Sequence, residues 1–173
     1  MQLWLYSSSR SEKRHERGAF SSGDQELDGW FRYRAGQDER RNVARVFLGV
    51  DDEVGIVGFY SLGSLSLVVD DLPHEIGRKL PPYEAIPAAL IGRLARATQA
   101  RGRGIGSLLL ADAVRRILGA SRSLAVFAIV VDAKDEQAMA FYESFGFRRF
   151  PGRPRRLFLL TSTAAEAFAR ASD

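Results

Sequence analysis

Three glycines alternate with other residues in one short loop of the chain: Gly102, Gly104 and Gly106. Glycine tolerates positive φ and has no Cβ to block a ligand, so such a loop can fold tightly and turn its N–H groups outward. A helical pattern begins at Ile105, and the positive end of a helix dipole favours an anion. Arg101 and Arg103 strengthen the positive field of the loop. The stretch therefore predicts a site for a phosphate or pyrophosphate.

Two better-known phosphate loops fit this spacing poorly. A P-loop needs Lys and then Ser or Thr after its last glycine, whereas Gly106 is followed by Ser107 and Leu108. The dinucleotide motif needs G-x-G-x-x-G, and this chain has G-x-G-x-G. The spacing Arg/Gln-x-x-Gly-x-Gly does fit, from Arg101 through Gly104 to Gly106, and it resembles the acetyl-CoA pyrophosphate loop of the GNAT family of N-acetyltransferases. A plain strand-to-helix turn is the alternative for this motif alone.

A second motif lies about 40 residues further along the chain. Residues 124–131 are almost wholly apolar, which is typical of a strand buried on both faces. Asp135 is the expected N-cap of a short helix that ends at Gly146. The residues that resemble the second GNAT signature are Asp135, Ala138, Phe141, Tyr142, Phe145, Gly146 and Phe147. With both motifs present in order, the chain is identified as a member of the GNAT family, with Phe141 expected to be an ordinary core aromatic.

This resemblance implies an acetyl-CoA site made of three parts. Backbone N–H groups of the loop would hold the pyrophosphate: Arg101, Gly102, Arg103, Gly104, Ile105, Gly106 and Ser107. A backbone donor near Leu94 or Ala95 would polarise the thioester carbonyl. Tyr142 would give its phenolic proton to the departing CoA thiolate, because a phenol of pKa ~10 stays protonated beside a thiol of pKa ~8.5. The remaining cofactor contacts implied are Arg96, Asp135, Ala138 and Phe141.

Further segments resemble one subgroup of the family, the acetyltransferase toxins of bacterial toxin–antitoxin pairs. They are His15 and residues 20–23, 27–30, 57–62, 86–95 and 130–135. The resemblance implies that the chain acetylates the α-amine of aminoacyl-tRNA, stops translation, and has a ribbon-helix-helix antitoxin as partner. One departure is that Arg96 and Ala97 stand where the subgroup usually has Val-Asp, so a cation and a methyl replace a carboxylate. Asp135 stands where the family usually has Asn.

The sequence offers no clear general base. An α-amine has a reference pKa of about 7.7–8.0, against ~10.4 for lysine, so a useful fraction is already neutral at physiological pH. A site without a base therefore suits an α-amine better than a lysine side chain. Two alternatives are left open: an acetyltransferase for a small amine or a protein N-terminus, and a non-catalytic module that binds acetyl-CoA.

Arginine supplies 22 of the 25 basic residues, and the formal net charge is +4. Guanidinium forks match phosphate geometry better than lysine does, which weakly favours a nucleic-acid partner. The expected nucleic-acid contacts are Arg93, Arg148, Arg149, Arg153, Arg155 and Arg156. The last five form what we call the arginine cluster, and a solvated charged turn is the alternative for it. Arg93, a weaker candidate, could instead pair with a core carboxylate.

Composition narrows the kinds of site and the cellular locations that we expect. The chain has 173 residues, no cysteine and two isolated histidines, so we expect no disulfide, no Cys nucleophile and no metal site. No apolar run approaches the ~20 residues that span a bilayer, and the N-terminus does not resemble a signal peptide. We therefore expect a soluble, cytoplasmic protein with one domain over residues 1–173 and possible homodimerisation.

The elements that must position these residues follow a mixed α/β pattern. We expect a helix from Asp24, a hairpin of strands 42–50 and 54–67, and an irregular segment over 68–86. Strand 86–97 then feeds the glycine loop, and helix 105–118 leaves it. Strands 147–150 and 157–161 and a helical turn over 164–171 complete the chain. In the family fold, the strand before the loop and the buried strand after its helix run parallel and splay apart, and acetyl-CoA enters between them.

Overall fold

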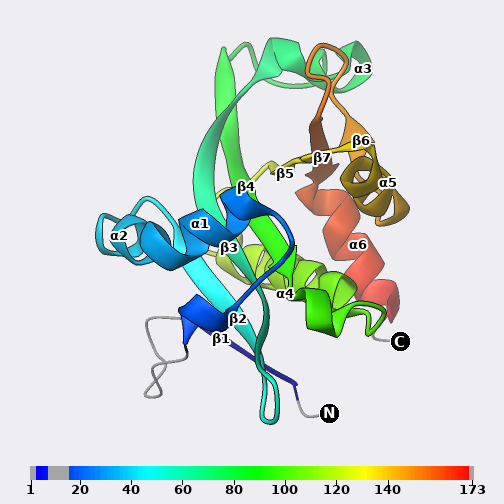
Figure 1. Cartoon of the computed structure of the whole chain (residues 1–173). Coiled ribbons are helices and arrows are strands. Elements are labelled where there is room, and N and C mark those ends of the chain that lie inside the picture. The colour runs from blue at the N-terminus through cyan, green and yellow to red at the C-terminus, as the bar shows by residue number, and fades with distance from the viewer. Residues whose placement is uncertain (1–2, 8–15, 172–173) are drawn as a thin grey trace. The chain divides into compact units, whose positions relative to one another are not determined.

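The computed structural model describes residues 3–7 and 16–171, so His15 lies outside the described residues (Figure 1). The fold has two compact units, each built from two chain segments. Unit 1 comprises Met1–Gly63 and Gly92–Ala113, and unit 2 comprises Ser64–Ile91 and Val114–Asp173. The expected single domain over 1–173 stays a prediction.

The strands form one mixed sheet in the order β1-β2-β3-β4-β5-β7-β6, which confirms the α/β class. Their bounds are β1 Leu3–Ser7, β2 Arg45–Asp51, β3 Gly55–Val68, β4 Ala85–Arg96, β5 Ala128–Asp132, β6 Arg148–Arg149 and β7 Arg156–Leu160. The helices are α1 Gln25–Tyr33, α2 Ala35–Arg40, α3 His74–Gly77, α4 Ile105–Ala120, α5 Glu136–Ser144 and α6 Thr161–Ala171. Short 3-10 helices are η2 Arg17–Ala19, η3 Val69–Asp71 and η4 Thr98–Ala100.

Unit 1 is built on the antiparallel strands β1, β2 and β3. The predicted hairpin is confirmed, and the Asp51 carboxylate closes its turn by accepting the N–H groups of Glu53 and Val54, each at 3.0 Å. Strand β2 begins at Arg45 and not at residue 42, because Asn42 has a φ of 58°, which breaks an extended strand. β1 is an edge strand of the sheet.

The helical layer of unit 1 begins at Asp24, as predicted. The Asp24 side chain accepts the N–H groups of Glu26 and Leu27, so it caps α1. Trp30 and Phe31 are buried, and the Phe31 ring stacks on Phe59 of β3 with centroids 4.2 Å apart. α1 ends at Tyr33, and after Arg34 a second helix, α2, begins at Ala35.

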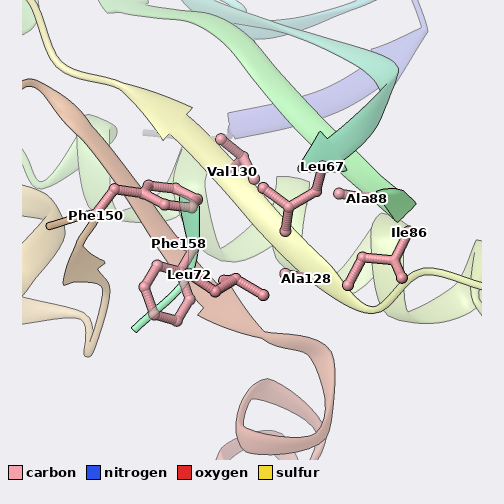
Figure 2. Close-up of a cluster of buried hydrophobic side chains, with 8 residues drawn as sticks. All are labelled: Leu67, Leu72, Ile86, Ala88, Ala128, Val130, Phe150 and Phe158. Atoms are coloured by element: carbon pink, nitrogen blue, oxygen red, sulfur yellow. The ribbon is translucent and has the colours of Figure 1, made fainter. Parts of the chain in front are cut away.

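Unit 2 contains the parallel pair of the sheet. β4 pairs with β5 from Ala88–Ala128 to Ile91–Val131, and β7 and β6 follow antiparallel. Eight buried residues form its core cluster (Figure 2): Leu67, Leu72, Ile86, Ala88, Ala128, Val130, Phe150 and Phe158. The segment predicted to be irregular contains η3 and the four-residue helix α3. Leu72, which follows η3, anchors this segment in the core cluster.

Three expected boundaries in unit 2 were wrong. β5 begins at Ala128 and not at residue 124, because residues 124–127 lie outside the sheet and Leu124 is 69% exposed. Only two residues of the expected strand 147–150 belong to β6. The expected C-terminal turn is an 11-residue helix, α6.

Candidate functional site

The last part of β4 leads into the glycine loop. Pairing of β4 with β5 ends at Ile91, one residue before β5 itself ends, while β4 continues to Arg96. The expected splay of this pair stays a prediction. The end of the strand is fixed within unit 1, because the Ala97 N–H donates to the Val57 carbonyl at 2.8 Å and the Thr98 N–H to the Ser21 carbonyl at 2.9 Å. The start of the loop is therefore held before a ligand binds.

Two of the three glycines have the expected backbone conformation. Gly102 has a φ of +77° and Gly104 a φ of +70°, values that L side chains rarely adopt. Gly106 instead lies in the first turn of α4 and does not have positive φ. Residues 101–104 are all exposed, so the loop is open to a ligand.

The loop does not offer all seven expected N–H donors. The Arg101 N–H donates to the Thr98 carbonyl at 3.2 Å, and the Arg103 N–H is directed at the Ala100 carbonyl at 3.4 Å. The N–H groups of Ile105, Gly106 and Ser107 open α4, where no preceding helical turn supplies acceptors. The N-terminus of this 16-residue helix, whose dipole favours negative charge, is therefore the part of the loop best suited to an anion.

Gly58 of β3 supports this element, and the sequence interpretation missed its role. A Cβ at Gly58 would lie 2.6 Å from Cδ1 of Leu109 in α4 and 2.9 Å from the carbonyl oxygen of Ala95 in β4. Only glycine lets the three elements approach this closely. The available signal was a glycine inside a strand pattern, which often marks a close approach of another element.

Arg93 lies on β4 in the same unit. Its guanidinium carbon is 4.2 Å from the centroid of the Trp30 ring, and Trp30 Nε1 donates to Asp38 Oδ2 at 2.8 Å. Desolvation lowers the pKa of Arg93, while the charges of Asp38 and Glu26 act to raise it. The expected alternative, a direct ion pair with a core carboxylate, is not formed among the described residues.

Tyr142 lies on α5 in unit 2 and is only 6% exposed. Burial is the main cause that raises its pKa to about 12, and the charge of Asp132 adds to the effect. Its ring packs between Phe141 and Phe147, with centroid distances of 5.2 and 5.7 Å. The phenol therefore stays protonated throughout the physiological range, as the predicted proton donor must.

The neighbours of Tyr142 on α5 are less buried than expected. Met139 and Tyr142 are the buried residues of α5, whereas Ala138 and Phe141 are half-buried and Phe145 is 40% exposed. Phe141 was predicted to be an ordinary core aromatic, and this was wrong. A helix advances about 100° per residue, so the face that contains Tyr142 and Met139 leaves Phe141 and Phe145 at its edge.

Asp135 caps α5 as predicted, because its Oδ1 accepts the Ala138 N–H at 2.8 Å. Replacing Asp135 by Ala should lower the free energy of unfolding by about 1 kcal/mol, since one N–H of the first turn loses its acceptor. Denaturant titration measures this change, and Asp135→Asn should recover most of the loss. Equal losses in the two variants would contradict the capping role.

The arginine cluster is paired with carboxylates within unit 2. The shortest nitrogen–oxygen distances are Arg148–Glu75 2.7 Å, Arg149–Glu143 2.8 Å, Arg153–Asp71 3.0 Å and Arg156–Asp132 2.7 Å. Arg149 also reaches Glu136, and Arg155 donates to the Lys134 carbonyl. The cluster therefore carries much less net positive charge than five free guanidinium groups would. Exposed pairs of this kind are weak, because water and salt screen them.

Residues 3–7 and 16–171 contain neither a cluster of metal ligands nor a membrane-spanning helix. No group of three or more His, Cys, Asp or Glu side chains in that part of the chain could hold a metal ion. None of its helices has the length and hydropathy needed to span a bilayer. The predicted loop residues lie in unit 1, and Tyr142, Asp135, Ala138 and Phe141 lie in unit 2.

The sequence matches the family model of the acetyltransferase (GNAT) domain over residues 43–149, which include both the glycine loop and α5. It is 38% identical over 146 residues to a tRNA-acetylating toxin of Mycobacterium tuberculosis, covering 84% of this chain and 86% of that protein. It is 32% identical over 158 residues to the probable toxin TacT of Sinorhizobium fredii, covering 87% of each.

The fold matches solved structures of the toxin AtaT. AtaT complexed with acetyl-methionyl-tRNAfMet superposes with a TM-score of 0.87 at 24% identity, covering 96% of this chain and 99% of that one. A tyrosine-to-phenylalanine mutant of AtaT, bound to acetyl-CoA and the C-terminus of the antitoxin AtaR, has a TM-score of 0.81 at 21% identity, covering 98% and 99%. At these identities, the likeness shows a common fold.

Proposed function

Because the chain belongs to the GNAT family of acetyl-CoA-dependent acetyltransferases, we propose that it acetylates the α-amine of aminoacyl-tRNA and thereby blocks translation. The observation that carries this proposal is the 38% identity, over 84% of the chain, to a tRNA-acetylating toxin. The match is not confined to the acetyl-CoA motifs, so it extends to regions that would distinguish one acetyl acceptor from another.

In the proposed mechanism, the amine of the substrate attacks the thioester carbonyl of acetyl-CoA directly. The N–H groups at the N-terminus of α4 hold the pyrophosphate, and a backbone N–H near Leu94 or Ala95 stabilises the developing oxyanion. Tyr142 would supply the proton that the CoA thiolate takes up when the C–S bond breaks. Asp135, Ala138 and Phe141 are the further residues that the family resemblance proposes as cofactor contacts.

The acceptor needs no dedicated base if it reacts as a neutral α-amine. Its reference pKa of about 7.7–8.0 leaves a useful neutral fraction at physiological pH. The proton that the amine loses on acylation then passes to solvent. Cysteine is absent from the chain, which is compatible with direct transfer without a covalent acyl-enzyme.

The proposed nucleic-acid contacts are Arg93 and the arginine cluster. A phosphate backbone would have to exchange with the carboxylates that now pair with the cluster, so affinity should fall as salt rises. The proposed protein partner is an antitoxin of the ribbon-helix-helix type, and homodimer formation and a cytoplasmic location complete the proposal. The partner is suggested by AtaT, which has been solved with its antitoxin AtaR.

Incubation with labelled acetyl-CoA tests the proposal directly. We expect label on bulk charged tRNA and none on uncharged tRNA, because only the charged form has the α-amine. Polyamines and peptides with free N-termini serve as parallel acceptors. Label that appears only on a polyamine or a peptide would keep the acetyltransferase and discard tRNA as its substrate.

A further inference from the structure

The six arginines expected to contact nucleic acid differ in what their guanidinium groups already bind. Four of the cluster are ion-paired with carboxylates, and Arg155 donates to the Lys134 carbonyl at 2.5 Å. Across residues 3–7 and 16–171, Arg93 is the one of the six whose guanidinium has neither a hydrogen bond nor an ion pair. Arg93, the weaker candidate on sequence grounds, is thus the one whose N–H donors make no hydrogen bond among the described residues.

The side chain of Arg93 is nevertheless held in place. It stacks on Trp30, which is 5% exposed and is itself fixed by the hydrogen bond from its Nε1 to Asp38. A guanidinium presents its N–H donors in its own plane, so stacking on one face leaves the fork available. The group is therefore oriented before a ligand arrives, which lowers the entropy cost of binding.

The guanidinium of Arg93 is also partly withdrawn from water without a bonded partner in the described part of the chain. It is half-buried, and desolvation lowers its pKa. Asp38 and Glu26 are close enough to influence it but not to pair with it, and Arg34 adds positive charge nearby. A half-buried charge without a bonded partner is costly, so an anion with two oxygens would gain more here than at an exposed arginine.

The place of Arg93 on β4 connects it to the proposed chemistry. Ala95 follows two residues later, which is about 7 Å along an extended strand. Leu94 and Ala95 are the positions proposed to donate to the thioester carbonyl. An anion bound by Arg93 would therefore belong to a part of a ligand close to its reacting end.

We propose that Arg93 binds a phosphate group of the nucleic-acid substrate and positions the aminoacyl end beside β4. This inference rests on the proposed function and adds the residue that anchors its substrate. A phosphate could also come from acetyl-CoA, but the N-terminus of α4 already provides a site for the cofactor pyrophosphate. The planar fork matches two oxygens of one phosphodiester, and the ammonium group of lysine cannot reproduce this geometry.

The test compares Arg93→Lys and Arg93→Gln with Arg34→Gln. Arg34 is exposed, and its charge contributes to lowering the pKa of Arg93. Arg34→Gln therefore removes a nearby positive charge and leaves the Arg93 guanidinium on Trp30 in place. Both Arg93 variants should raise the KM for charged tRNA by roughly tenfold to a hundredfold, the usual effect of losing a charged hydrogen-bonded pair. The KM for acetyl-CoA should stay within about twofold of wild type, whereas Arg34→Gln should change the KM for charged tRNA less than about threefold at 0.15 M salt.

Binding of uncharged tRNA gives a readout that does not depend on activity. The dissociation constant should rise in both Arg93 variants by a similar factor, with thermal melting and acetyl-CoA binding as checks that each variant is folded. An unchanged tRNA affinity in Arg93→Lys would overturn the inference, and so would an increase confined to the KM for acetyl-CoA. A wild-type protein that binds tRNA but does not acetylate charged tRNA would overturn the proposed function. The role of Arg93 in binding phosphate would still be decided by the tRNA dissociation constants of its variants.

Discussion

Replacing Tyr142 by Phe should lower kcat for acetyl transfer roughly 10²–10⁴-fold, the usual contribution of one general acid. The substitution removes the proton donor for the CoA thiolate and keeps the ring that packs against Phe141 and Phe147. The affinity for acetyl-CoA should stay close to wild type, because the substitution removes none of the groups proposed to hold the pyrophosphate. Steady-state kinetics and a direct binding titration separate the two effects.

Tyr83 provides the matched control for this experiment. It is 64% exposed in unit 2, and Tyr83→Phe removes the same hydroxyl group from a position without a proposed role. Its activity should equal that of wild type. A Tyr142→Phe enzyme that turns over at the wild-type rate would show that another group, or water, protonates the thiolate.

The pH profile adds a second criterion for Tyr142. A general acid acts only while it is protonated, and burial raises the pKa of Tyr142 to about 12. Its protonated form therefore persists far above neutral pH, and Tyr142 should cause no loss of activity on the alkaline side until the pH approaches that value. A loss in kcat near pH 10 that disappears in Tyr142→Phe would contradict this assignment.

Replacing Gly58 by Ala should weaken the acetyl-CoA site and destabilise the fold. The new Cβ would lie 2.6 Å from Cδ1 of Leu109 and 2.9 Å from the Ala95 carbonyl oxygen. Leu109 can move part of the way, but the backbone oxygen can move only if β4 moves. Overpacking of this kind costs about 1–3 kcal/mol, which corresponds to a Tm lower by roughly 2–10 °C for a chain of this size.

The functional effect of Gly58→Ala should appear as a higher KM for acetyl-CoA, because both displaced elements flank the glycine loop. Gly29→Ala is the matched control, since a Cβ at Gly29 in α1 meets no atom within 4 Å. This control should keep full activity and gain about 0.5–1 kcal/mol from the better helix propensity of alanine. A Gly58→Ala protein with normal stability and a normal KM would show that β3 and α4 do not need this close approach.

The parts of the site that local sequence determines were predicted well. Asp135 was identified as a helix cap, and Gly102 and Gly104 as the positions where the backbone turns left-handed, because each depends on a few neighbouring residues. The succession of β4, loop and α4 follows from the same local patterns, with bounds within two residues of those expected. For this reason, the two acetyl-CoA motifs, and with them the family, could be recognised from the sequence.

The parts that depend on distant segments were not predicted. Glu75 and Asp71 pair with arginines that lie 73 and 82 residues later in the chain, and no spacing rule connects them. The stack of Arg93 on Trp30 likewise joins β4 to α1, and Gly58 matters only because α4 packs over it. Each of these contacts is made by tertiary packing, so the sequence showed the residue without its partner.

The interleaving of the two units has a consequence for synthesis on the ribosome. Unit 1 cannot close until its second segment, Gly92–Ala113, has left the exit tunnel, and unit 2 needs its own second segment, Val114–Asp173. Residues 1–91 alone therefore complete neither unit. Tyr142 is supplied by the second segment of unit 2, so an enzyme proposed to stop translation would not become active until that segment has been synthesised and unit 2 has closed.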